Sequence, residues 1–579
     1  MCRAPSVACR SVSRLTRIGA LVALIACAVR PLAAQQLRGT VLFSDSTTPA
    51  RATLIHALDS TGAVVARTLT TPLGAFALTV PGEGRYTVRV LRIGYRPFDV
   101  RGVRATLAAA PPLTILLRSA SITLPAIAVR GERTCRARAD SSQAVYGVWE
   151  EARKALQSAE AAGAAGNLVT EWFTYRRQVL ADSGSIYEEI VDEGRGRTPK
   201  PFISVAPESL ALDGYRRMRG GLARYLGPDA AVLLSDVFLG GHCFRLNPPA
   251  AAHPGWVGVE FEPASERRNV IEITGTAWLE RATAELKLVE FRYTNLPRDV
   301  TEAGARGRIE LTRLPTGEFV INRWYITMAG VQEMRRDLRE FGLVHSESRR
   351  VITHANLSGG ELRGARVAGL EQYALAPNLV TLTLVADSGA VSTAFASLSV
   401  VGEAGVSALT DSAGVARVVG LGEGEHRVRI VTPAMREMVA RPIERRFTIG
   451  PDAPGRTATI TVSERDLVAA VCGAEVARRG NALVTGVLRD PDGDIAQNDT
   501  LEVRWTRAPK QGEMLTTEPR EWNGKRVGTD EYGRWMVCDV PRPSMLALLR
   551  VTDDPMAEMA RVRLSRERQL VRLEVTARK

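Results

Sequence analysis

The sequence contains little lysine and no long apolar run. Only six of its 76 basic residues are lysine, so the net charge of +13 is carried almost entirely by scattered arginines. No basic segment is interleaved with aromatic residues, which is the pattern that stacks on nucleic-acid bases. We therefore predict that nucleic acid is not a partner. A helix needs about 18 consecutive apolar residues to cross a bilayer, and we predict no transmembrane helix in the mature chain.

The short motifs of the common enzyme active sites are also absent. The 579 residues contain no HExxH, GxSxG, SxxK, GxxxxGK[ST] or CxxC pattern, and none of the six histidines begins an HxxE. Asp490, Asp492 and Asp494 alternate as in a calcium loop, but the glycine at position four and Leu501 at position twelve favour a hairpin turn. We predict a protein that is not an enzyme and that holds no metal or cofactor.

The first 34 residues have the layout of a secretory signal peptide. Four arginines within residues 3–17 precede the apolar run 18–29, and small residues follow up to Ala34. We predict cleavage after Ala34 and export of the mature chain, which would be periplasmic, associated with the outer membrane or secreted. Removal of this segment would leave 71 basic against 63 acidic residues, a net charge of +8.

Cys27 belongs to a second processing pattern. It ends the sequence Leu-Ile-Ala-Cys, which resembles the bacterial lipobox, and a lipid on Cys27 would tether the protein to a membrane. We favour cleavage after Ala34 because the first β-pattern begins directly behind it, at Leu37. The mass of the mature protein distinguishes the two sites.

Cleavage after Ala34 would leave four cysteines in two well-separated couples. An even set in an exported protein predicts disulfide bonds, and pairing within each couple needs no contact between remote domains. We predict the bonds Cys135–Cys243 and Cys472–Cys538. Closing loops of about 108 and 66 residues would stabilise the fold by roughly 4–5 kcal/mol each.

Residues 37–130 alternate short strand patterns with Gly and Pro turns, which is typical of a β-sandwich. The expected strands are 37–43, 52–58, 64–70, 75–80, 86–93, 114–117 and 122–129. A turn cassette centred on Gly74 recurs at Gly414 and Gly533, with an apolar residue two positions later that would point into a core. Three copies of the cassette predict three related sandwiches.

Four short runs in the first of these segments resemble the carboxypeptidase regulatory-like domain. They are LRGTV at 37–41, TPLGAF at 71–76, VPG at 80–82 and IGY at 93–95. The resemblance implies a transthyretin-like sandwich, often found in bacterial envelope proteins, that has no peptidase activity of its own. This sandwich class is grouped with carbohydrate-binding-like folds, so a glycan is an implied partner.

The middle of the chain has a different pattern. Residues 140–142 can cap a helix that places Val145, Trp149, Ala152 and Leu156 on one face. A further helical pattern lies at 228–238. Strands are expected at 169–180, 185–192, 256–262, 270–280, 286–293, 306–314, 318–328 and 344–354, forming an antiparallel meander. The runs GTAWLE and LVEFRY, at 275–280 and 288–293, resemble the curved half-barrel of periplasmic lipoprotein-carrier proteins, whose concave face holds acyl chains.

We therefore predict a mainly β, multidomain protein, in which transthyretin-like or Ig-like sandwiches flank an α+β middle domain with a curved antiparallel sheet. The expected divisions are a signal peptide at 1–34, regulatory-like sandwiches at 36–131 and 472–579, the middle domain at 135–370 and a further sandwich at 372–465. We predict a non-catalytic binding or scaffolding module of the cell envelope.

Two alternatives remain for what it binds. Trp522 lies in a polar loop and could stack on a sugar, in which case glycan binding would be lost in Trp522→Ala. The middle domain could instead carry a lipid or another apolar ligand, which would co-purify with the protein.

Overall fold

The structure is a computed structural model. It describes residues 35–106, 111–117, 124, 134–135, 143–164, 168–181, 184–196, 204–219, 222–247, 254–265, 267, 269–296, 298, 300, 304–314, 317–340, 343–367, 373–375, 379–389, 391–403, 405–450, 456–509, 521–551 and 557–577. The predicted strand at 122–129 lies outside these residues except for Leu124, which is not in a strand.

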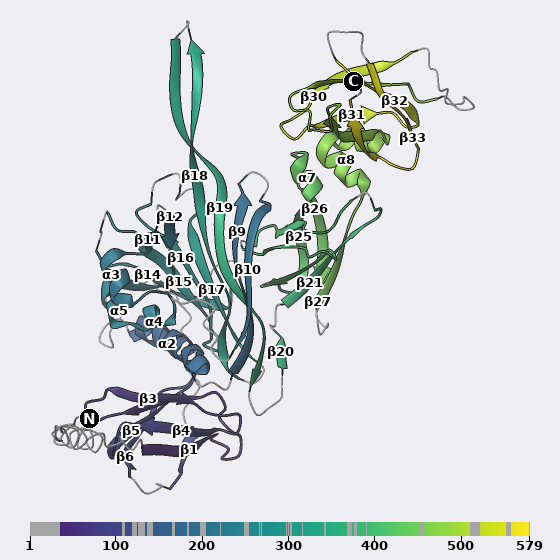
Figure 1. The fold of residues 1–579 in the computed structure, drawn as a ribbon. Helices are drawn as coiled ribbons and strands as arrows, with labels where there is room; N and C mark the ends of the chain where they lie inside the picture. Colours follow the sequence, from purple (N-terminus) through teal and green to yellow (C-terminus); the bar gives the residue numbers. More distant parts are fainter. Residues whose placement is uncertain are drawn as a thin grey trace, which may run out of the picture.

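Three pairs of sheets share one strand order, and this confirms the predicted mainly β, multidomain fold (Figure 1). In the first pair, β4 (Ala75–Val80), β1 (Gln35–Phe43) and β7 (Leu113–Leu117) face β3 (Val64–Leu69), β2 (Leu54–Leu58), β5 (Gly84–Leu91) and β6 (Phe98–Ala105). The sequence pattern missed β6, because most of its residues are exposed or half-buried.

The second and third pairs repeat this order. The second consists of β24 (Val415–Val419), β21 (Leu379–Ala386) and β27 (Arg456–Val462), with β23 (Ser407–Leu409), β22 (Ser397–Val400), β25 (Gly424–Val431) and β26 (Ile443–Ile449). The third consists of β31 (Arg534–Val540), β28 (Ala482–Arg489) and β34 (Leu570–Thr576), with β30 (Asn523–Gly528), β29 (Thr500–Trp505), β32 (Ser544–Arg550) and β33 (Ala557–Leu564). In each, the first strand is antiparallel to the fourth and parallel to the seventh.

The turn cassettes have the same geometry in all three sandwiches. Each cassette glycine has a positive φ, and its carbonyl oxygen accepts a hydrogen bond of 2.8 Å from a backbone N–H of the first strand. The glycines are Gly74, Gly414 and Gly533, and the donors are Val41, Leu384 and Leu488. The apolar residue two positions later is buried, as predicted: Phe76, Ala416 and Trp535. The cassette therefore fixes the turn and one core residue together.

Adding a side chain at the cassette glycine Gly74 should lower the free energy of unfolding more than adding one at an uncrowded glycine. In Gly74→Ala the new Cβ would lie 2.4 Å from the carbonyl oxygen of Val41, whereas nothing lies within 4 Å at Gly62, which has a similar φ. Gly62→Ala should cost about 1–2 kcal/mol for the left-handed backbone alone, and Gly74→Ala about 1–3 kcal/mol more for the clash. Native-state hydrogen exchange of the β1 and β4 amides measures the difference. Equal losses in the two variants would contradict this account.

The middle of the chain forms one antiparallel sheet of eleven strands. Ten follow the order β10 (Ile186–Gly196), β9 (Leu168–Leu180), β19 (Leu343–Val367), β18 (Phe319–Glu340), β17 (Arg306–Arg313), β16 (Leu286–Tyr293), β15 (Ile273–Glu280), β14 (Trp256–Pro263), β13 (His242–Asn247) and β8 (Thr134–Cys135), and β20 (Tyr373–Leu375) pairs with β19. Strands β18 and β19 are longer than predicted, because their outer halves pair only with each other and extend beyond the sheet (Figure 1).

Glycines opposite aromatic rings mark bends in this sheet. Phe291 lies directly between Gly275 and Gly307 on the neighbouring strands. A Cβ on Gly307 would meet the Phe291 ring at 2.0 Å, and one on Gly275 would meet the ring of Phe261 at 2.6 Å. Aromatic rings that cover strand glycines are a known way to build curvature into a sheet.

Helix α2 (Gln143–Ala164) covers one face of the sheet, which we call the inner face. The four residues predicted to share one side of the helix are all buried, and the Trp149 ring centroid lies 5.0 Å from that of Phe244. The rest of the inner face is covered by α3 (Pro207–Asp213), α4 (Ala230–Leu234) and α5 (Asp236–Gly241). The helix predicted at 228–238 is therefore two short helices, because Ser235 ends α4 and its hydroxyl caps α5.

The first sandwich docks on α2 through a buried ion pair. The Glu151 carboxylate accepts a hydrogen bond of 2.8 Å from the backbone N–H of Gly94, while the Lys154 ammonium donates to Glu151 at 2.5 Å and to the Tyr95 carbonyl oxygen at 2.6 Å. Both charged side chains are at most 3% exposed. The IGY motif at 93–95 thus makes the contact between the first sandwich and the middle sheet.

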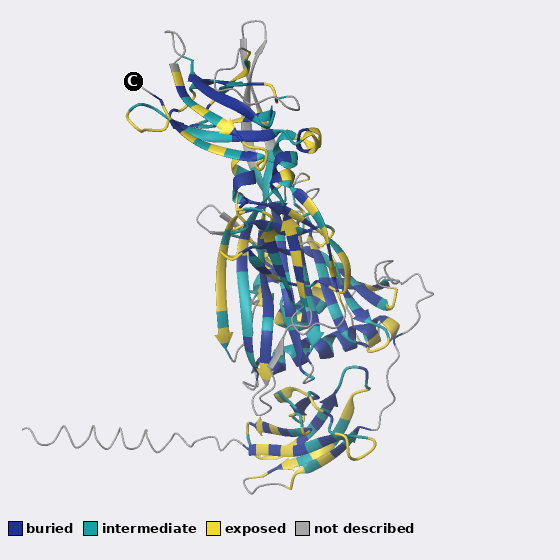
Figure 2. Cartoon of the chain, turned by 90° about the vertical axis from the view of Figure 1, so that its right-hand side faces the viewer, coloured by how far each residue is buried: buried dark blue, intermediate teal, exposed yellow. Residues whose placement is uncertain are grey.

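The second sandwich lies against the opposite, outer face of the sheet. The Arg323 guanidinium, 2% exposed, donates to the Val419 carbonyl oxygen at 3.2 Å. The backbone N–H of Ile186 donates to the Ser397 hydroxyl at 2.8 Å, and Arg436 donates to the Ile186 carbonyl oxygen at 2.7 Å. Figure 2, which views the molecule from the side of the second sandwich, shows the first sandwich below the middle sheet and the third sandwich above it. In the described part of the chain no helix combines the length and apolarity needed to span a bilayer.

Candidate functional site

A groove of about 870 Å³ separates the second and third sandwiches. One wall is the end of α7 (Pro433–Glu437) with the residues that follow it. The floor is the outer side of the three-stranded sheet β31-β28-β34, bordered by β30. The groove therefore forms only where these two sandwiches meet.

The groove has an exposed apolar lining. On the α7 side Val439 is 88% exposed, and on the sheet side Met536 is 41% exposed. Met438, Val487 and Leu573 also line the groove. Val439 has a φ of +50°, a backbone conformation that is strained for a β-branched residue and that is concentrated at functional sites. The groove is therefore a candidate binding surface.

Charged side chains border the apolar lining. Arg534 and Asp530 form an ion pair at 2.8 Å, and Arg489 pairs with Glu574 at the same distance. Burial opposes ionisation of Asp530, but hydrogen bonds from the backbone N–H groups of Arg534 and Tyr532 and from the Arg534 side chain hold its pKa below the usual value. Asp530 therefore stays ionised and keeps Arg534 in place at neutral pH.

The two walls are held together at a buried junction. Helix α8 (Glu464–Cys472) follows the second sandwich, and its first residue, Glu464, is 8% exposed. Its carboxylate accepts hydrogen bonds from the backbone N–H groups of Gln569 at 2.9 Å and Leu570 at 3.3 Å, and from the Ser388 hydroxyl at 2.9 Å. Ser388 belongs to the second sandwich, whereas Gln569 directly precedes β34 and Leu570 begins it. One carboxylate therefore joins both sandwiches.

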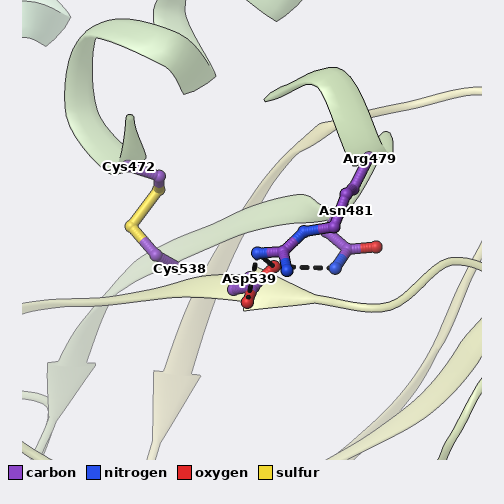
Figure 3. The surroundings of a disulfide bond; sticks show 5 residues. All are labelled: Cys472, Arg479, Asn481, Cys538 and Asp539. Atoms are coloured by element: carbon purple, nitrogen blue, oxygen red, sulfur yellow. Dashed lines mark hydrogen bonds and ion pairs between the residues drawn. A yellow bond between two sulfur atoms is a disulfide. The ribbon is translucent and has the colours of Figure 1, made fainter. Parts of the chain in front are cut away.

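The predicted disulfide Cys472–Cys538 is confirmed (Figure 3). It joins the end of α8 to β31 and closes 66 residues of sequence. Beside it, the Asp539 carboxylate pairs with Arg479 at 2.9 Å and accepts a hydrogen bond of 2.7 Å from the Asn481 amide. The bond ties the helical linker, including α9 (Ala474–Arg479), to the sheet that floors the groove.

The other predicted couple is brought together by β8 and β13. Cys135 lies directly opposite Cys243 in the antiparallel register, and Cys243 is disulfide-bonded. Directly opposed residues have Cα atoms about 4.5–5.5 Å apart, which suits a disulfide. The side chain of Cys135 is outside the described residues, so the bond Cys135–Cys243 stays a prediction. Cys27, the predicted lipidation site, also lies outside them.

Trp522 borders a strand and lies beside an arginine. It directly precedes β30 and is half-buried, and the guanidinium carbon of Arg561 lies 5.7 Å from its ring centroid. A cation in that position competes with a sugar for the ring. The Asp490 segment is a hairpin turn, as predicted: the Asp490 carboxylate accepts backbone hydrogen bonds from Asp492 at 2.9 Å and Asp494 at 3.0 Å.

A smaller cavity of about 250 Å³ lies at the inner face of the middle sheet, lined by α3, α5 and β13 residues such as Leu210, Phe238 and His242. Burial lowers the pKa of His242 to about 4, although its Nδ1 lies 2.9 Å from the Phe238 carbonyl oxygen. The remainder of this face is filled by α2. This cavity is the inner-face position that an apolar ligand of the middle domain would occupy. The described residues contain no cluster of three or more His, Cys, Asp or Glu side chains suited to a metal ion.

The groove is not marked by any local sequence motif. Val439 and Met536 are almost one hundred residues apart, and neither stands in a motif. The available local signal was the pair of apolar residues Met438 and Val439 directly after the charged residues Arg436 and Glu437.

The solved structures found by comparison are only distantly similar. The shaft pilin SpaA of Lactobacillus rhamnosus GG is 8% identical, over 35% of this chain and 98% of that chain, with a TM-score of 0.13. A variant of BcpA, the major pilin subunit of Bacillus cereus, is 8% identical over 94% and 99%, with a TM-score of 0.12. The Bacillus anthracis TIE protein is 10% identical over 62% and 64%, with a TM-score of 0.14. TM-scores this low carry no argument about function.

No curated protein matches the chain. One family does match part of it, over residues 36–118, and its description is that of the carboxypeptidase regulatory-like domain. These residues include all four runs that resemble this family, β1 from its second residue onward, and the strands β2 to β7. Residues 36–118 therefore form a carboxypeptidase regulatory-like domain.

Proposed function

We propose that this is an exported protein that acts without catalysis, by binding a partner protein of the cell envelope in the groove between its second and third sandwiches. The observation that carries the proposal is the exposed Val439, held in a left-handed conformation across the groove from Met536. Methionine and aliphatic side chains that stay exposed in this way are typical of surfaces that receive apolar side chains of another protein.

The junction supports a scaffolding role. Glu464 and the disulfide Cys472–Cys538 connect both sides of the groove. The binding surface is therefore formed before a partner binds, and little conformational entropy would be lost on binding. We infer the same division of the chain as above: a signal peptide at 1–34, sandwiches at 36–131, 372–465 and 472–579, and a middle domain at 135–370 that holds the sandwiches apart.

Charge substitutions in the groove test this function. The mature protein and its Val439→Asp and Met536→Asp variants are immobilised and exposed to a detergent-solubilised envelope fraction of the producing cell. Val64→Asp is the matched control, because Val64 is 51% exposed on β3 of the first sandwich. We expect a defined protein to be retained by the wild type and the control, and about tenfold less by the groove variants, which corresponds to about 1.4 kcal/mol. Equal retention by all four proteins would refute the proposal.

Glycan binding that is lost in Trp522→Ala would support the carbohydrate alternative instead. Lipid that co-purifies with the wild type and with both groove variants would support an apolar-ligand carrier that uses the middle domain.

A further inference from the structure

Two arginines face each other on the outer face of the middle sheet. Arg292 on β16 and Arg306 on β17 are directly opposed in the antiparallel register, and both are exposed. Directly opposed residues have Cβ atoms about 4.5–5.5 Å apart on the same face of a sheet, and like charges in such a pair repel each other. Neighbouring positions on each strand point to the inner face, where Phe291 is buried.

Neighbouring carboxylates are already engaged by other cations. Within the described residues, neither Arg292 nor Arg306 forms an ion pair. Glu290 pairs with Arg308 at 3.2 Å, and Arg308 also pairs with Glu310 at 2.8 Å. Arg292 also helps to lower the pKa of Glu260 on β14, after the larger effect of Arg245.

Glu260 does not balance Arg292. Both of its oxygens accept hydrogen bonds of 2.7 Å from the Arg245 guanidinium. The opposed arginines therefore leave positive charge without a matching partner at this point of the sheet.

The arginine pair lies in a cleft of about 420 Å³. One wall is the outer face of strands β15 to β18, where Thr276 and Tyr325 also line the cleft. The facing wall is the turn at Gly402 and Glu403 that joins β22 to β23 of the second sandwich. Glu403 is exposed and forms no ion pair with a described residue. The one negative charge of its carboxylate is too little to balance the two positive charges of Arg292 and Arg306.

We propose that this cleft binds a doubly charged oxyanion of the phosphate type, held between the guanidinium groups of Arg292 and Arg306. A guanidinium presents a planar fork of N–H donors that matches two oxygens of such an anion. An anion between the two side chains replaces their repulsion by two attractive contacts. This site is separate from the groove of the proposed function, so either proposal can fail without the other.

Inorganic phosphate is the probe for this site. The thermal unfolding of the full mature chain is measured in sodium phosphate and in sodium chloride at equal, low ionic strength. We expect phosphate to raise the unfolding temperature of the wild type, because a ligand that binds only the folded state stabilises it. In Arg306→Gln the apparent affinity for phosphate should fall about tenfold or more, the loss of one charge-assisted contact.

The unfolding temperature of Arg306→Gln in sodium chloride distinguishes an anion-binding arginine from one that only stabilises the fold. Because Arg306→Gln relieves repulsion from Arg292, its unfolding temperature in chloride should equal or exceed that of the wild type. Arg429→Gln is the matched control: Arg429 is exposed and pairs with Glu444 at 3.0 Å in the second sandwich, so its phosphate response should be retained. The proposal is overturned if phosphate gives the wild type no shift beyond chloride, if Arg306→Gln keeps the full response, or if Arg306→Gln is less stable than the wild type in chloride. A larger shift with acetate than with phosphate would also overturn the assignment of a doubly charged anion.

Discussion

Lys154→Met is expected to lower the free energy of unfolding by about 3–5 kcal/mol, because it leaves the buried Glu151 carboxylate without its counter-charge. The two side chains are 3% and 1% exposed, so water cannot replace the lost ammonium group. The change also removes the donor to the Tyr95 carbonyl oxygen. The contact between the first sandwich and α2 should therefore open before the rest of the molecule, which hydrogen exchange of the α2 amides would detect.

The adjacent Arg153→Met is the control for loss of a positive charge on the same helix. Arg153 pairs with Glu150 at 2.8 Å, and its side chain is 33% exposed. A pair of this kind is worth about 0–1 kcal/mol, so the control should change little. Equal losses in Lys154→Met and Arg153→Met would contradict a docking role for the buried pair.

A double substitution isolates the cost of the unpaired charge. Burial raises the pKa of Glu151 even though the Lys154 ammonium and the Gly94 N–H both favour its ionised form. Removal of the charge together with its partner, in Glu151→Gln with Lys154→Met, should therefore cost less than Lys154→Met alone. A double variant that is less stable than the single one would show that the hydrogen bonds, and not the buried charge, dominate this contact.

Trp149→Ala is expected to cost about 3–5 kcal/mol, the range for removal of a large buried aromatic side chain. Trp149 is 1% exposed in the core between α2 and the inner face of the sheet, and its ring lies 5.0 Å from that of Phe244. Its Nε1 has no hydrogen-bond partner among the described residues, so the loss would come from apolar contacts and from the cavity left behind. Chemical unfolding of the full chain, followed by tryptophan-independent far-ultraviolet circular dichroism, measures the loss.

Gly147→Ala on the same helix should raise the free energy of unfolding, whereas Trp149→Ala lowers it. Gly147 is exposed, and nothing lies within 4 Å of a Cβ added there. Alanine stabilises a helix interior by about 0.5–1 kcal/mol relative to glycine. If Gly147→Ala destabilised the protein as Trp149→Ala does, α2 would respond to any substitution, and the account of Trp149 as a core residue would fail.

The parts of the fold that depend on local chemistry were predictable from the sequence. The cassettes at Gly74, Gly414 and Gly533 could be recognised because each needs a glycine with positive φ and a buried apolar residue two positions later. The buried face of α2 followed from its helical period. The bond Cys472–Cys538 followed from an even cysteine set in two couples.

Features that arise between remote segments were not predictable. The contact of Glu151 with Gly94 joins residues 57 positions apart, and neither residue type indicates its partner. The outer halves of β18 and β19 are polar and pair only with each other, so no core pattern marks their length. The groove is formed by α7 and by strands of the third sandwich, which are far apart in the sequence. The left-handed conformation of Val439 could not be predicted either, because valine rarely adopts it.

Photo-crosslinking in the producing cell tests the proposed groove most directly. A photoreactive phenylalanine analogue replaces Val439 in the groove or Val64 on the first sandwich, both of which are exposed valines. We expect an adduct of one defined mass at position 439, absent at position 64, that disappears when Met536→Asp is added. No adduct at position 439, or the same adducts at both positions, would contradict the claim that the groove binds a partner protein.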